Sequence, residues 1–397
     1  MSVDGAHVRS LPTHAGMVDA ALAQLDGEVD WLQALSPIHN DALWTGFKHS
    51  GYKRIAALQY IDLDIDLPAA RQRLLALPMD QIESPLLSGL LTEKQREIER
   101  QIQLVQMRGT DGFITASLDL FGSVKPPLLK LANEILKNVP RVDDPPDDAG
   151  IEEVLAAVEE DLRWYRERSP NFSCEVVVDD DLNSMMMVSH GRFYINGKIR
   201  LPRARVQPLV QHEIGTHVLT RHNGRHQALR QLEVGLAHYD PLQEGLGVLA
   251  EYLSGYLPGE RLRILAARVV AVEMAIHGEG VPAIFDMLHN IHGLPMDDAF
   301  DVAVRALRGG GLTKDAVYLS GLVDLIDYLH ENGEFEPLFI GKFALSHRVV
   351  LDQLIGEGWA VAPQLMPRYF TNNRALARLA ECRTRPVAEL FQKEPST

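Results

Sequence analysis

Hydrophobic residues recur at helical spacing along most of the chain, with polar residues between them. From 17 to 35 the apolar side chains return every three or four positions while acidic residues fall outside the stripe, which predicts a helix. Within 259–289 the same pattern places Arg261, Arg263 and Arg268 on the outer face. The chain is therefore expected to be predominantly helical, with further helices over 68–76, 85–107, 125–138, 151–168, 228–237, 259–289, 297–307, 316–330 and 345–356.

Two stretches carry the pattern of extended structure. Residues 60–67 alternate between apolar and acidic side chains, which suits a half-exposed strand or an extended lead-in to a helix at Pro68. A calcium site is disfavoured there, because no glycine-turned loop with a bidentate glutamate follows. Short β-branched or methionine-rich runs separated by turn residues predict three or four strands at 174–178, 185–190, 192–196 and 198–200. The expected fold class is α+β, with one small antiparallel or mixed sheet.

Composition suggests how the chain is divided. The stretch 140–150 is rich in proline and aspartate and lacks core residues, so it is expected to be a linker. It would separate an N-terminal helical region (16–139) from a second domain (151–385). Residues 1–15 are expected to be a disordered tail, and residues 386–397 a loose one.

Charge and cysteine content narrow the class of protein. The chain has 397 residues, 46% of them hydrophobic, and a net charge of −15. Nucleic acids and anionic membranes favour clustered lysine and arginine, so neither is an expected partner. The two cysteines, Cys174 and Cys382, lie far apart, which favours reduced thiols over a disulfide framework. With no signal-peptide pattern or long apolar run, we expect a cytoplasmic protein.

One apolar helical segment contains His212-Glu213-x-x-x-His217. In the common zinc-protease motif H-E-x-x-H, histidines four apart share a helix face and bind Zn²⁺, while the glutamate activates water. Five residues apart in a regular helix, two imidazoles diverge by roughly 140°. A π-bulge would absorb the extra residue, and Gly215 would ease the distortion. The alternative is two ordinary surface histidines, but charged groups in so apolar a helix need a metal or partners.

A second helix offers the remaining ligand. Pro241, Gln243 and Glu244 have the character of a helix start, which places Glu244 in the first turn and Glu251 two turns later on the same face. A glutamate from the following helix commonly completes a three-ligand catalytic zinc site and leaves one position for water. Glu251 is the other candidate for the third ligand, or a group that orients a histidine. Asp240 could take that orienting role too.

His212-Glu-Ile-Gly-Thr-His217 together with Gln243-Glu-Gly-Leu-Gly247 resembles the flavohemoglobin expression-modulating QEGLA-motif proteins. That family is similar to the microtubule-associated tyrosine carboxypeptidases, which also carry H-E-x-x-x-H. The resemblance runs from about residue 20 to about 370. It implies a zincin-like metallopeptidase fold in which the sheet precedes the active-site helix, residues 151–385 form the catalytic domain, His212, His217 and Glu244 bind one Zn²⁺, and Glu213 is the base. The sequence has glycine instead of alanine at position 247, a small-for-small change expected to leave the chemistry undisturbed.

Further residues are candidates for supporting roles. In zinc peptidases of this kind an edge strand can pair with extended substrate. The strand 192–196 is the candidate edge, with Tyr194 as a possible substrate or oxyanion contact; simple covering of the helix is the alternative. His222 and His226 are weaker candidates for ligands, because a fourth protein ligand would remove the water position.

The run Arg308-Gly-Gly-Gly-Leu-Thr-Lys-Asp315 is a second place to look for function. It lacks the ending of a phosphate-binding P-loop. It can be a flexible joint between helices, capped by Thr313. It can instead be a substrate clamp, with Arg308 or Lys314 holding a carboxylate and Tyr318 donating to an oxyanion. The first interpretation is favoured.

The sequence thus predicts a zinc metallopeptidase in which Glu213 assists attack of a zinc-bound water on a peptide bond of a peptide or protein substrate, and a carboxypeptidase is one form that this activity can take. Two alternatives stay open. One is a non-catalytic regulatory or binding protein that retains the metal site, and the other is a metal-dependent amidase acting on small molecules. Substrate, oligomeric state and the role of the N-terminal helices are not indicated.

Overall fold

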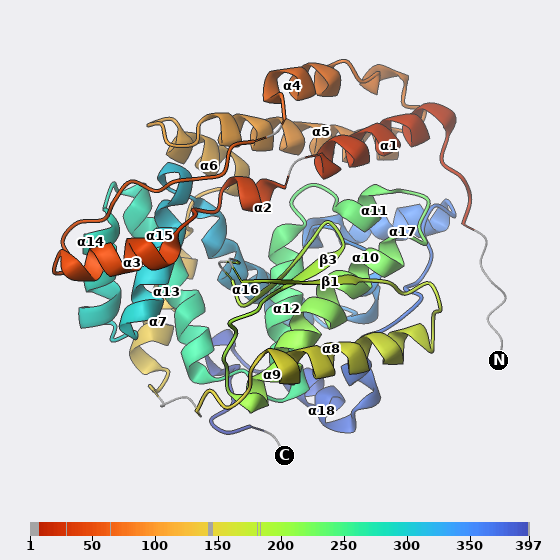
Figure 1. Ribbon diagram of the computed structural model, residues 1–397. Helices are drawn as coiled ribbons and strands as arrows, with labels where there is room; N and C mark the ends of the chain where they lie inside the picture. Colours follow the sequence, from red (N-terminus) through yellow and green to blue (C-terminus); the bar gives the residue numbers. More distant parts are fainter. Residues whose placement is uncertain are drawn as a thin grey trace.

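The computed structural model describes residues 8–28, 30–63, 65–141, 146–180, 182 and 184–395, and helices dominate it (Figure 1). Buried apolar side chains from the N-terminal helices, the sheet and the C-terminal helices form one contiguous core. The helices α1 (Thr13–Gly27), α4 (Leu67–Leu75) and α5 (Pro85–Gln106) lie across the top of the view, above the central sheet. In the described residues, no helix combines the length and apolar character needed to cross a membrane.

The N-terminal region follows the predicted pattern with two differences. The helix expected over 17–35 is split after Gly27, and its first part begins at Thr13, inside the expected tail. Among the described residues of 60–67 none lies in a strand; Leu67 already belongs to α4, and Asp66 caps that helix by accepting a hydrogen bond from the Ala69 N–H (2.9 Å). Residues 1–7 of the expected tail and 142–145 of the expected linker lie outside the described residues. The helices are α1 (Thr13–Gly27), α2 (Trp31–Ala34), α3 (Asn40–His49), α4 (Leu67–Leu75), α5 (Pro85–Gln106), α6 (Phe113–Phe121), α7 (Pro126–Asn138) and α8 (Ile151–Arg166).

A small mixed sheet precedes the helix that carries the motif, as predicted. Its strands are β1 (Glu175–Asp179), β2 (Met186–Ser189) and β3 (Arg192–Asn196), in the order β1-β3-β2. β3 pairs parallel with β1 and antiparallel with β2. The prediction that 192–196 is an edge strand is therefore wrong. Phe193 and Ile195 on β3 are fully buried, and a central position in the sheet provides that burial. The optional strand at 198–200 is not formed; Leu201 makes only an isolated bridge to Ala149.

The motif segment is a helix with a π-helical turn in its middle. α9 (Arg203–His212) runs into a π-helix (Glu213–Val218) and then into α10 (Leu219–Gly224). After α11 (Gln231–Val234), α12 (Asp240–Ser254) returns beneath the sheet and packs against α9 and the π-helix. The predicted π-bulge is confirmed.

Of the C-terminal helices, α16 (Val317–His330) and α18 (Asn373–Cys382) pack against α12. α13 is buried on most sides, so the prediction that its arginines face outward is wrong. Arg263 donates to the backbone oxygens of Leu136 and His292 (both 2.5 Å), which gives both terminal nitrogens of its buried guanidinium a partner. The helices are α13 (Gly259–Ile276), α14 (Val281–Asp286), a π-helix (Met287–Ile291), α15 (Met296–Leu307), α16 (Val317–His330), α17 (Arg348–Gly356) and α18 (Asn373–Cys382).

The final segment, expected to be loose, is attached to the end of α12. The Gln392 N–H donates to the Leu257 backbone oxygen (2.8 Å), and its side-chain oxygen accepts from the Leu257 N–H (2.6 Å). The Gln392 amide also donates to the backbone oxygen of Tyr252 (2.9 Å), within α12. The segment therefore closes the end of the helix that carries the candidate ligand Glu244.

α12 and α16 approach each other so closely that glycine is required on both helices. A Cβ added to Gly321 would lie 1.8 Å from the Pro241 backbone oxygen, and one added to Gly245 would lie 2.5 Å from the Gly321 backbone oxygen. Neither backbone oxygen can move without shifting a helix. Gly245 directly follows Glu244, so this contact between the helices helps to fix the position of Glu244.

Replacing Gly321 by alanine should therefore destabilise the protein by about 3 kcal/mol, because the helices must separate. Urea unfolding would measure the change. The matched control is Gly89→Ala in α5, where an added Cβ meets nothing within 4 Å, and it should leave stability unchanged or raise it by about 1 kcal/mol. Equal stabilities of the two variants would contradict the close crossing.

Candidate metal centre

The π-helical turn brings the two motif histidines to one side of the helix. Their ring centroids lie 5.2 Å apart, a separation that a regular helix does not give to residues five apart. Gly215 lies within the turn, and a Cβ there would come within 2.7 Å of the Gln211 side-chain oxygen. The missing side chain thus leaves room for the distorted turn.

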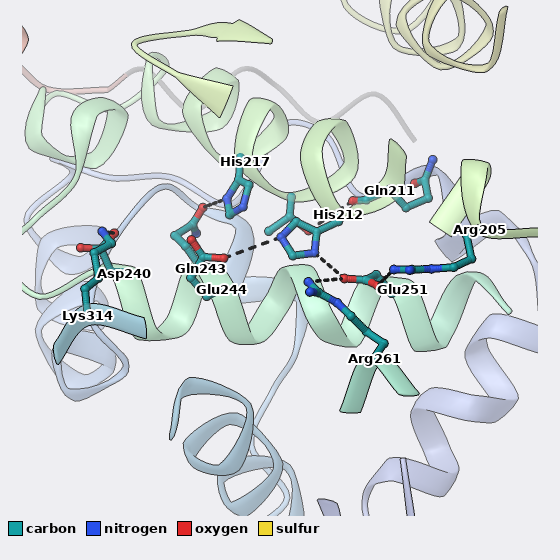
Figure 2. Close-up of polar contacts among 11 residues, drawn as sticks. Arg205, Gln211, His212, His217, Asp240, Gln243, Glu244, Glu251, Arg261 and Lys314 are labelled. Atoms are coloured by element: carbon teal, nitrogen blue, oxygen red, sulfur yellow. Dashed lines mark hydrogen bonds and ion pairs between the residues drawn. The ribbon is translucent and has the colours of Figure 1, made fainter. Parts of the chain in front are cut away.

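His212, His217 and Glu244 form a single cluster. Each offers one ligand atom, and these three atoms lie within 4.8 Å of one another. The His212 Nε2 lies 3.7 Å from the Glu244 Oε2. Figure 2 shows both histidines reaching from the motif helix towards α12, which carries Glu244. Two imidazoles and a carboxylate are a common ligand set for catalytic Zn²⁺.

The remaining nitrogen of each ring has a partner on α12. The His212 Nδ1 lies 2.9 Å from the Glu251 Oε1, and the His217 Nδ1 lies 3.3 Å from the Gln243 Oε1. With each Nδ1 engaged in this way, each Nε2 is left to face the cluster. Such outer contacts fix ring orientation in metal sites, so these residues fit a bound zinc ion.

Arginines hold the outer carboxylate in turn. The side chain of Glu251 is fully buried, and Arg205 and Arg261 lie 3.5 and 3.3 Å from its oxygens. Figure 2 places these three residues towards one end of α12, beyond His212. Sequence reasoning missed Arg205 and Arg261, because a buried arginine looks like a surface residue in a helical pattern.

Burial and neighbouring charges shift the pKa values of the cluster. Burial opposes a charge on His212, but Glu244 and Glu251 outweigh it and raise the pKa to about 10. Burial lowers the pKa of His217 to about 4. The pKa values of Glu244 and Glu251 fall to about 2, because neighbouring cations and hydrogen bonds outweigh burial. The cluster therefore holds ionised carboxylates beside a neutral His217, while His212 would have to give up a proton when a divalent cation binds.

Glu213 lies in the π-turn beside the first histidine. Its side chain is buried, and in the described part of the chain its Oε2 has no hydrogen-bond partner. Burial raises its pKa to about 7, with Glu244 and Glu251 adding to the effect. Burying a carboxyl oxygen without a hydrogen-bond partner lowers the stability of the fold. A carboxyl group that titrates near neutrality is suited to proton transfer.

Comparison with known proteins identifies the family. A family model described as microtubule-associated tyrosine carboxypeptidase matches residues 45–385, which is most of the chain. The chain belongs to this family. Its members are metallopeptidases, in agreement with the His212, His217 and Glu244 cluster. The resemblance drawn from the sequence motifs is confirmed, and none of the curated proteins compared matches the chain.

Other candidate residues of this tyrosine carboxypeptidase family member lie apart from the cluster. Asp240 contacts neither histidine and instead pairs with Lys314 (2.8 Å). The ring of His222 forms hydrogen bonds with the side chains of Ser169 and Gln364 (both 3.2 Å) and does not belong to the group of three ligand atoms. The ring of His226 hydrogen-bonds to the backbone oxygen of His222 (2.8 Å).

The residues proposed for substrate contact have varied positions. The Arg268 guanidinium lies 4.7 Å from the Tyr318 ring, and Glu244 raises the pKa of that tyrosine further after burial. Tyr194 alternates with the buried residues of β3 and so lies on the opposite face of the sheet from the core. Arg308 is buried and pairs with Asp315 (3.2 Å). Among the residues proposed for substrate contact, both Tyr318 and Lys314 have Glu244 in their charge environments.

The surroundings of Gly247 differ from the expectation that glycine and alanine are equivalent at this position. A Cβ at this residue would lie 2.6 to 2.8 Å from three atoms of the His212 ring. Because Glu251 holds that ring, it cannot swing away freely. Glycine here is thus part of the site geometry, and the exchange with alanine is not neutral in this chain.

Replacing Glu251 by glutamine should weaken zinc binding about tenfold, because the ring of His212 loses its anionic partner. Competition with a chelator would measure the affinity. Glu152→Gln, an exposed position on α8, is the matched control and should bind zinc as the wild type does. Unchanged affinity in Glu251→Gln would contradict the orienting role.

Proposed function

We propose that this protein is a zinc-dependent carboxypeptidase that hydrolyses the last peptide bond of a peptide or protein. The observation that supports this most directly is the convergence of His212, His217 and Glu244, with Glu213 beside them. The family model supports the reaction class independently.

The ligand roles follow from the contacts of the cluster. His212 and His217 would bind zinc through Nε2, and Glu244 through a carboxylate oxygen. Glu251 and Gln243 would hold the two rings in place from behind. Bound there, zinc would act as a Lewis acid towards the scissile carbonyl and would acidify water.

Glu213 is proposed as the general base. It would take a proton from the attacking water and deliver it to the leaving amine. Its Oε2 is free to accept this proton, because no other described group hydrogen-bonds to it. Burial keeps bulk water from competing for the same oxygen.

A non-catalytic metal protein is the weaker candidate. A structural zinc site does not need an unpartnered carboxyl group beside its first ligand, and keeping Glu213 buried without a partner costs stability. An amidase acting on small molecules would use the same chemistry. The match to a carboxypeptidase family favours a peptide substrate.

The proposal also covers the side chain of the released residue, which is tyrosine, and the cellular compartment, which is the cytoplasm. The family name specifies tyrosine, and a cavity of about 370 Å³ with aromatic and aliphatic walls could receive such a side chain. Cys174 and Cys382 are free, which supports action in the cytoplasm.

Glu213→Gln should retain about one zinc per chain and lose turnover by a factor of about 1,000 or more, because the base is removed and the ligands remain. His217→Ala should lose both zinc and turnover. Elemental analysis and release of free amino acid from a peptide mixture would measure the two properties. A wild-type chain without zinc, or a Glu213→Gln variant with full turnover, would rule out this mechanism.

A further inference from the structure

A charged cavity lies at the N-terminal end of α12, the helix that carries Glu244. Its volume is about 370 Å³, and its wall includes Asp240, one helical turn before Glu244 on α12. Five cationic side chains from separate parts of the chain also line it: Lys94, Arg221, Arg308, Lys314 and Lys342. In Figure 2, Asp240 and Lys314 lie at the end of α12 that is opposite to Glu251.

Four of these five cations already have anionic partners. Lys314 lies 2.8 Å from Asp240, Arg308 lies 3.2 Å from Asp315 and Arg221 lies 3.0 Å from Glu233, while Lys94 lies 2.9 Å from Glu97. The acidic groups of the wall are paired as well, Asp26 with Lys94 (3.5 Å) and Asp30 with His190 (3.7 Å). Among the described residues, Lys342 alone of the five has no carboxylate within 4.0 Å.

Lys342 is more than nine-tenths buried. Its ammonium lies 5.7 Å from the centre of the Tyr239 ring, a contact that supplies partial compensation and no negative charge. Burial lowers the pKa of Lys342 to about 8, with Arg221 adding to this effect while Asp240, Glu244 and Asp26 oppose it. A buried cation without a counter-ion is costly, and an anionic ligand would remove that cost.

The backbone around Lys342 is held in place. The Lys342 N–H donates to the Leu232 backbone oxygen (2.8 Å), and its carbonyl oxygen accepts from the Leu236 N–H (3.0 Å). A Cβ on the preceding Gly341 would lie 2.5 Å from that Leu232 oxygen, so the close approach needs glycine. The side chain is therefore presented from a fixed point, as a recognition group should be.

The charge of Lys342 also reaches the cluster. It is among the groups that lower the pKa of His217, and Glu244 is among those that raise the pKa of Lys342. A ligand anion on Lys342 would thus lie in the cavity on the Asp240 side of the metal ligands. In a carboxypeptidase the free carboxylate lies one residue beyond the scissile carbonyl, so a cation close to the metal cluster is what its recognition requires.

We propose that Lys342 binds the α-carboxylate of the substrate's C-terminal residue, whose side chain enters the cavity. This rests on the proposed carboxypeptidase function and specifies which end of the substrate the cavity holds. Apolar walls at Trp31, Leu120, Phe121 and Leu312 give the side chain an apolar or aromatic environment. Of the cations expected from the sequence, Lys314 is paired with Asp240, and Arg308 is tied to the Asp315 carboxylate that it shares with Arg305, so both are held in the wall.

Binding is tested in a zinc-loaded Glu213→Gln background, so that the probe is not consumed. The probes are a fluorescein-labelled glycine peptide that ends in tyrosine with a free carboxylate, and the same peptide as a C-terminal amide. Fluorescence anisotropy gives the affinity of each. Lys342→Met should weaken binding of the acid by about 10- to 100-fold and leave the weak binding of the amide unchanged. Lys342→Arg should restore part of the affinity for the acid.

Two further variants sharpen the comparison. Lys314→Met should have a smaller effect on the acid, because that lysine is already paired, and the exposed Lys130→Met is the control for preparation. Equal loss of acid and amide binding in Lys342→Met, or failure of the parent to prefer the acid, would overturn the inference. If acid preference depends on Lys342 while no peptide is ever cleaved by the wild type, the carboxylate site stands and the proposed catalysis fails.

Discussion

The hydrogen bond between His212 and Glu251 ties together the two helices that build the site. It is buried on both sides and joins the motif helix to α12. Glu251 could not be ionised there without Arg205 and Arg261, and His212 would be free to turn without Glu251. A chain of charged groups thus runs along α12, and each group offsets part of the free-energy cost of burying the next one. At His212 these charges meet the other two candidate metal ligands, His217 and Glu244.

Close backbone packing keeps that chain in register. Gly245 and Gly321 allow α12 to lie against α16, and Gly247 allows the His212 ring to lie against α12 itself. Glu244 directly precedes Gly245 and lies three residues before Gly247 on the same helix. The candidate ligand is therefore positioned by contacts on both sides of its own helix, and the small residues that follow it allow close approach instead of providing flexibility.

Local patterns predicted what depends on local periodicity. The helices, the position of Glu244 in the first turn of α12 and the π-turn between His212 and His217 all follow from spacing within one segment. Features that depend on contacts between distant segments could not be predicted from the sequence. The central place of β3 depends on which strand pairs with β1, and the burial of Arg263 depends on carbonyl oxygens from distant segments. Lys342 carries no signal in the sequence, since only the pairing of its neighbours leaves it without a counter-ion.

The π-turn also affects how this site can change. Removing Gly215 would leave His-Glu-Ile-Thr-His, in which the histidines of a regular helix would share one face. Because the π-turn absorbs one residue, the same deletion would return this turn to regular helix and leave the later residues on their present faces. Val218 and Leu219, which are almost fully buried, would then stay in the core. The long and short spacings of the motif are thus one deletion apart, and the packing of the helix is the same on either side of that change.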